Sequence, residues 1–89
     1  MKAIVTVLGK DRVGIIARVS TYLAERNANV LEITQTIVQG YFNMLMIVDI
    51  GTCTSSPADL AVGMKDLGEE MGLVINLQRE EIFECMHRV

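Results

Sequence analysis

The sequence is poor in aromatic residues, since its 89 residues include no tryptophan, two tyrosines and two phenylalanines. Such a chain has no row of rings on which unpaired bases could stack. Basic residues are also few: eight lysines and arginines stand against eleven aspartates and glutamates, which leaves a net charge of −3. Because this charge opposes a phosphate backbone, we do not expect nucleic acid as a partner.

Cysteine and histidine are almost absent. Cys53, Cys85 and the one histidine, His87, lack the spacing of a zinc site or a disulfide framework, so we expect reduced thiols, no metal and no cofactor. The chain opens on strand-like residues without the basic and apolar regions of a secretory leader. No apolar run reaches the ~18 residues that cross a bilayer. We therefore expect a cytoplasmic protein that does not enter a membrane.

Catalytic patterns are equally scarce in the sequence. No serine, cysteine or carboxylate stands in an arrangement with a second histidine or an adjacent buried acid, which a nucleophile or a general base requires. We therefore do not expect an enzyme.

The first part of the chain predicts a strand followed by a helix. Residues 2–8 are rich in β-branched side chains and predict a strand with apolar residues on both faces. Residues 13–26 predict an amphipathic helix, closed by the asparagines of 27–29, because asparagine tolerates the left-handed conformation of many helix ends. The apolar residues at helical spacing are Ile16, Val19 and Leu23.

Two segments with a period of two then predict a hairpin that turns near Gly40. In residues 30–39, strict alternation places Leu31, Ile33, Gln35 and Ile37 on one face, with Val30 and Glu32 on the other. In residues 41–50, one face is wholly apolar and the other is mixed. The apolar face consists of Phe42, Met44, Met46, Val48 and Ile50.

The second half predicts a helix, a strand and a short tail helix. Ser56 suits the N-cap, Pro57 the first helical position and Gly72 the C-terminal left-handed position. Gly63 and Gly68 each weaken this helix by about 1 kcal/mol relative to alanine, so packing has to compensate. A strand follows at 73–78. The tail helix is expected at about 80–87, with Ile82, Phe83 and Met86 on its apolar side.

This order of elements is the split βαβ, or ferredoxin-like, pattern, an α+β sandwich in which two helices cover one face of a four-stranded antiparallel sheet. We expect one domain, residues 1–89, including the tail helix. At this length, roughly two thirds of the unfolded chain's surface can be buried, so stability is marginal. Burying the second sheet face or a sheet edge against another copy would supply the missing stability. A homodimer is therefore predicted.

The stretch "VLGKDRVGIIARVSTYLAERNANVLEI" resembles the ACT domain, in which the first strand ends in a turn of type G-x-D-x-x-G-[IL] and an asparagine precedes the second strand. The resemblance covers about residues 2–80. The segment "ITQTIVQGYFNM" and an "IF" near the end are similar to the short, free-standing, UPF0237-like members. One difference is Val13, where the family often has proline. The matching positions are Gly9, Asp11, Gly14, Ile15, Asn29 and Val30.

The resemblance implies a regulatory module that binds a small molecule, commonly an amino acid, between this turn of one copy and the second strand, or the neighbourhood of that strand, in another. An aspartate carboxylate would bind the ligand's ammonium, and amides at the start of the helix would bind its carboxylate. The expected ligand-binding residues are Asp11, Arg12, Val13, Gly14, Ile15 and Asn29.

A purely structural interpretation of the same residues stays open at this point. Asp11 would then cap the helix, and Gly14 would only permit tight packing of the helix on the sheet. Asn29 would be a cap residue as well.

Two further similarities are weak. The segment "VQGYF" (38–42) resembles part of the acylphosphatase loop, but here it joins two strands and no arginine follows. Tyr41 and Phe42 occupy a central strand, as base-stacking aromatics do in RNA-recognition domains, but their neighbours are apolar and no basic residue flanks them. We expect a hairpin turn and packing residues at these positions.

Three functions are therefore compared. The first is the amino-acid-binding regulatory module, acting on an enzyme or another protein. The second is an interaction module that docks on such a protein without a ligand of its own. The third, an enzyme of unrecognised type, would show a buried, strongly perturbed titratable group in a cleft.

Overall fold

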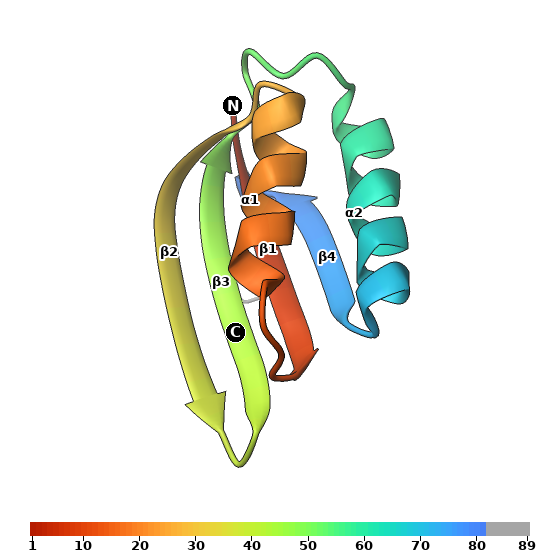
Figure 1. The fold of residues 1–89 in the computed structure, drawn as a ribbon. Helices are drawn as coiled ribbons and strands as arrows, with labels where there is room; N and C mark the ends of the chain where they lie inside the picture. The colour runs from red at the N-terminus through yellow and green to blue at the C-terminus, as the bar shows by residue number, and fades with distance from the viewer. Residues whose placement is uncertain (82–89) are drawn as a thin grey trace.

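A computed structural model describes residues 1–81 of the chain. It contains the six elements β1 (Lys2–Lys10), α1 (Ile15–Glu25), β2 (Asn29–Val38), β3 (Tyr41–Asp49), α2 (Pro57–Met71) and β4 (Val74–Arg79) (Figure 1). The predicted tail helix, with Ile82, Phe83 and Met86, lies outside the described residues except for its first positions.

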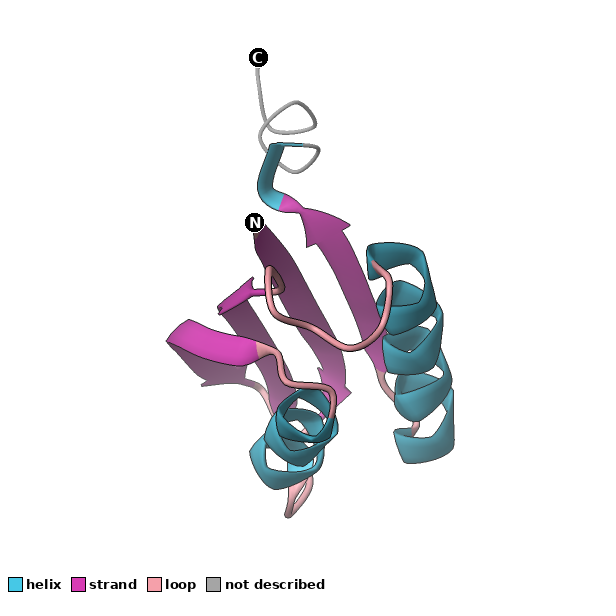
Figure 2. Cartoon of the chain, turned by 90° about the horizontal axis from the view of Figure 1, so that it is seen from above, coloured by secondary structure: helices cyan, strands magenta, loops and turns pink. Residues whose placement is uncertain are grey.

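The four strands form one antiparallel sheet in the order β2-β3-β1-β4. Both helices lie on the same side of this sheet, as Figure 2 shows from above. This is the ferredoxin-like βαββαβ arrangement that the sequence predicts.

The core lies between the helices and the sheet. On β1 the core residues are the odd ones, Ala3, Val5 and Val7, and on β3 the even ones, because Val5 pairs with Met46 and so places both side chains on the same face. Ile4 is also buried, but it lies on the opposite face and outside this core. The predicted apolar face of the third strand is confirmed, since every member is buried. The strand residues of the core are Ala3, Val5, Val7, Phe42, Met44, Met46, Val48, Ile75 and Leu77.

The second strand departs from strict alternation. A register shift between Val30 and Glu32 leaves Leu31 as an extra residue, so Val30 pairs with the core residue Val48. Val30 packs against the core, and its expected place on the opposite face was therefore wrong. A β-bulge of this kind changes which face a residue occupies without leaving a clear sign in the sequence.

The first helix begins two residues later than the sequence predicts. Its buried residues are Ile15, Val19 and Leu23, spaced four apart, whereas Ile16 only packs partly against the core. The helix ends as predicted in an asparagine with positive φ, Asn27 at 62°.

The second helix has the predicted ends, and its packing against β4 explains why Gly68 is a glycine. The Ser56 side chain accepts a hydrogen bond from the amide of Asp59, and Gly72 adopts the left-handed conformation. A methyl group on Gly68 would lie 2.8 Å from the carbonyl oxygen of Leu73. This glycine therefore lets α2 approach β4 closely, and the packing offsets the loss of helix propensity.

Replacing Gly68 by alanine should lower the stability of the fold. The change favours the helix by about 1 kcal/mol, but the new methyl group meets backbone atoms that cannot move aside, at a cost of roughly 2 to 3 kcal/mol. We expect a net loss of about 1 to 2 kcal/mol in urea unfolding. Gly63→Ala is the matched control, because its methyl group meets only the side chain of Tyr22. A Gly68→Ala protein more stable than the parent would contradict this account.

Candidate functional site

The turn between β1 and α1 is tied to the tip of the β2–β3 hairpin. The amide of Asp11 donates a hydrogen bond to the carbonyl of Gly40 over 2.9 Å. The tip consists of Gln39 and Gly40, with φ values of 54° and 80°, the positive values that a two-residue hairpin turn requires. In Figure 1 the hairpin tip, the turn and the start of α1 lie at the same end of the molecule.

The same turn is also tied to the end of α2. The guanidinium of Arg12 donates a hydrogen bond to the carbonyl oxygen of Met71 over 2.9 Å. In the first turn of α1, Arg18 forms an ion pair with Glu70, with 2.9 Å between the guanidinium nitrogen and the carboxylate oxygen. The last turn of α2 has no basic residue of its own, so these two arginines supply the positive charge that a helix C-terminus favours.

The start of α1 carries unused hydrogen-bond donors. Gly14 stands at the N-cap position with φ 89°, and no side chain caps the helix. Asp11 therefore does not act as a helix cap. Open space surrounds the position where a Cβ of Gly14 would lie, so this glycine serves the positive φ and not tight packing. The amides of the first helical turn, which have no acceptor within the helix, remain available for a ligand.

A groove of about 350 Å³ lies between this turn and β2. Two charged side chains line it, the carboxylate of Asp11 and the guanidinium of Arg12. Within residues 1–81, Asp11 has no side-chain hydrogen bond and no ion pair. The other lining residues are Gly14, Ile15, Ile16, Ala17, Gln35, Ile37 and Phe42.

The structure brings most of the expected binding residues together at this turn. Val13 lies there as well, but its side chain is 98% exposed and does not line the groove. Asn29 lies at the opposite end of the same sheet, because it pairs with Asp49, whose other partner is Lys2. Within one chain, Asn29 is therefore far from Asp11.

Sequence reasoning missed the wall that β2 contributes. Gln35 and Ile37 line the groove, and Ile37 pairs with Phe42, whose side chain is buried in the groove floor. The signal was available in the hairpin, because a turn at Gly40 brings the end of β2 to the same end of the sheet as the end of β1, with β3 between the two strands.

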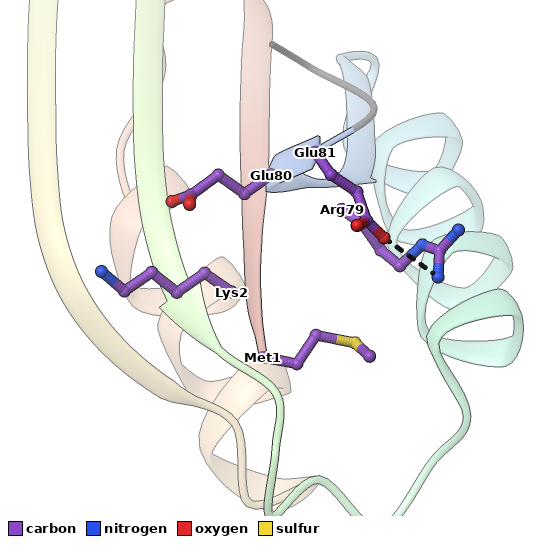
Figure 3. Close-up of a pocket in the computed structure, with 5 residues that line it drawn as sticks. All are labelled: Met1, Lys2, Arg79, Glu80 and Glu81. Atoms are coloured by element: carbon purple, nitrogen blue, oxygen red, sulfur yellow. Dashed lines mark ion pairs between the residues drawn. The ribbon is translucent and has the colours of Figure 1, made fainter. Parts of the chain in front are cut away.

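A second hollow, of about 230 Å³, lies beside the chain's first residues (Figure 3). Lys2 and Glu80 point to one side of it, while Arg79 and Glu81 point to the other and form an ion pair at 3.3 Å. The charges of these four side chains balance one another, and the hollow borders on residues outside the described part of the chain. We assign no function to it.

At this end of the sheet, Asp49 stabilises a turn. Its carboxylate accepts a hydrogen bond from the amide of Gly51 over 2.9 Å, and this bond is the main cause that lowers the pKa of Asp49. The amino group of Met1, 3.6 Å away, acts in the same direction. The role is structural, because the residue lies far from the groove.

Residues 1–81 show neither a clustered set of metal ligands nor a membrane-spanning helix. In residues 1–81, no cluster of three or more histidine, cysteine, aspartate or glutamate side chains is placed to hold a metal ion. Cys85 and His87 lie outside that range. Neither helix in this part of the chain is long and apolar enough to cross a membrane.

Comparison with known proteins identifies the fold family. The family model for the ACT domain matches residues 2–78. A UPF0237 protein of Bifidobacterium longum is 54% identical over 88 residues, 99% of this chain and 98% of that protein. A UPF0237 protein of Listeria innocua is 46% identical over the full length of both. The solved structure of an ACT domain protein from Streptococcus pneumoniae superposes with a TM-score of 0.82, at 38% identity over 94% of each chain.

Replacing Arg12 by glutamine should loosen the turn from α2. The change removes a charge-assisted hydrogen bond that is partly buried, and we expect a loss of about 1 kcal/mol in urea unfolding. Arg18→Gln is the control, because its ion pair with Glu70 is exposed and should contribute less than about 0.5 kcal/mol. Equal losses of unfolding free energy in the two variants would show that the hydrogen bond to the Met71 carbonyl contributes no more than an exposed ion pair.

Proposed function

The chain belongs to the ACT domain family, and on this premise we propose that it is a cytoplasmic regulatory module without catalytic activity that binds an amino acid in the groove between the turn and β2. Members of this family commonly act as regulatory, ligand-binding modules. The observation that carries the proposal is the pairing, in one groove, of a carboxylate without a partner and a helix start without a cap.

These two features match the charges of a free amino acid. The ammonium of the ligand would bind the carboxylate of Asp11, which no described side chain neutralises. Its carboxylate would bind the amides of the first helical turn, where the helix dipole favours negative charge. Gly14, Ile15 and Ile16 carry these amides and line the groove.

The exposed edge of β2 supports a homodimer. Nine of the ten residues of β2 are exposed and only Val30 is half-buried, so a long strand edge presents unpaired backbone groups. Natural proteins rarely leave such an edge free, because it pairs readily with another strand. We propose that two copies pair through their β2 strands across a two-fold axis.

The regular part of β2, residues 32–38, indicates the register of this pairing. A two-fold axis at Gln35 places Ile33 opposite Ile37 of the partner subunit and Thr34 opposite Thr36 of the partner subunit. Apolar side chains then face apolar ones, and threonines face threonines, which are favourable cross-strand pairs.

The same register explains how Asn29 could take part in binding. In the antiparallel pair, the start of the partner's β2 runs past the end of this strand toward Gly40. Asn29 of the partner subunit thereby reaches the end of the sheet that carries Asp11. The proposed site is thus shared between two chains. The turn would contribute Arg12 and Ile15, and Val13 only through its backbone amide, because its side chain does not line the groove.

Charge changes on β2 should test the dimer and its register together. In Thr34→Asp/Thr36→Asp, carboxylates would face carboxylates, and the dimer should dissociate at least about tenfold more readily. In Thr34→Asp/Thr36→Lys, each carboxylate would face an ammonium, and the dimer should persist. Light scattering at micromolar concentration measures both.

A wild-type protein that scatters light as a monomer would overturn the dimer. Dissociation of both double variants would overturn the register. Asn76→Lys, a charge change on the exposed part of β4, should leave the mass unchanged.

Replacing Asp11 by asparagine should weaken ligand binding without unfolding the protein. The change removes a charged hydrogen-bond acceptor, which costs about 1.5 to 3 kcal/mol of binding free energy. Calorimetric titration against the twenty amino acids first identifies the ligand, and the variant is then titrated with it. Asp66→Asn, at an exposed position on α2, is the control. If no amino acid binds the wild type, the interaction module without a ligand replaces this proposal.

A further inference from the structure

The wall of the groove restricts the side chain of the ligand. We infer that the groove accepts an uncharged amino acid with an apolar side chain and rejects charged ones. This inference rests on the proposed function, and it adds a chemical class that the turn alone does not define.

The ammonium and carboxylate groups of an amino-acid ligand would occupy the two charged side chains of the groove. Its two charged side chains, one acid and one base, give it no net charge, as an amino-acid zwitterion has none. The guanidinium of Arg12 gives one hydrogen bond to the carbonyl oxygen of Met71, and its charge and remaining N–H groups would be taken by the ligand's carboxylate together with the helix amides. A lysine or glutamate ligand would bring a third charge, and no further ionisable side chain of the described residues lines the groove to receive it.

Away from the turn, the groove is bounded mainly by apolar side chains. Ile37 and Phe42 are cross-strand partners on the helix-facing side of the sheet, and Ile16 faces them from α1. Ile37 is 59% exposed although it stands beside the buried Phe42. A ligand side chain laid on Ile37 would remove apolar surface from water, whereas a charged group there would lose its hydration without gaining a partner.

Gln35 is the one uncharged polar side chain of the groove. Its amide could bond to a hydroxyl group, so serine and threonine are the main competitors of an apolar ligand. Valine and threonine have nearly the same shape, and their comparison separates the two possibilities.

Titration calorimetry with a homologous series tests the inference on the wild-type protein. Alanine, 2-aminobutyrate, norvaline and norleucine differ by one methylene each, and each methylene buried should tighten binding about fourfold, equivalent to ~0.8 kcal/mol. Valine should bind roughly tenfold more tightly than threonine, and lysine and glutamate more weakly than alanine.

Ile37→Thr should reduce the gain in affinity per added methylene, which flattens the series. Norleucine should lose at least about fourfold in affinity relative to alanine. Ile33→Thr is the matched control, because Ile33 faces the same side of β2 but does not line the groove. Both variants weaken the proposed dimer contact alike. A difference between them in affinity for the series is therefore due to the loss of Ile37 from the groove wall.

Each outcome has a distinct meaning. A steep series in the wild type that only Ile37→Thr flattens supports the inference. A flat series, or threonine, lysine or glutamate as the tightest ligand, overturns it and leaves the proposed function in place. If none of these compounds nor any other amino acid binds, the proposed function itself fails.

Discussion

The left-handed backbone of Gly14 is the constraint on which the rest of the site depends. Because φ is positive at this residue, the chain can turn sharply out of the strand and enter α1 without a capping side chain. The first amides of the helix are then left without a capping acceptor, on residues that line the groove. A capping serine or aspartate at this position would have occupied them. The anchors at Gly40 and Met71 hold the turn on both sides, so its geometry is fixed before any ligand arrives.

The elements of the fold could be predicted because their signals are local. Ser56 sets the start of α2 through its side-chain oxygen, Pro57 through its fixed φ and Gly72 sets the end through its left-handed conformation. Asn27 ends the first helix in the same way as Gly72. The faces of the strands were harder. The bulge at Leu31 depends on how β2 twists against β3, and no single residue of the sequence indicates it.

The turn of the candidate site was equally local and was predicted, while its opposite wall was not. Ile37 joins the groove only because the hairpin folds back beside β1, a contact between segments distant in the sequence. The N-cap position of Gly14 also excludes the capping role that the structural interpretation gives to Asp11, since α1 begins at Ile15 and no side chain caps it. The role proposed for Asn29 depends on a second chain, which the pattern of one sequence cannot place.

A site shared between two chains has a thermodynamic consequence. If the ligand contacts the turn of one chain and Asn29 of the partner subunit, it binds the dimer better than the monomer. By linkage, the ligand must then strengthen the dimer by the same factor by which dimerisation strengthens ligand binding. The exposed edge of β2 would thus be more than a stabilising surface. It would be the element through which the concentration of an amino acid is converted into a change of assembly, which a regulated protein can read without any chemistry in this domain.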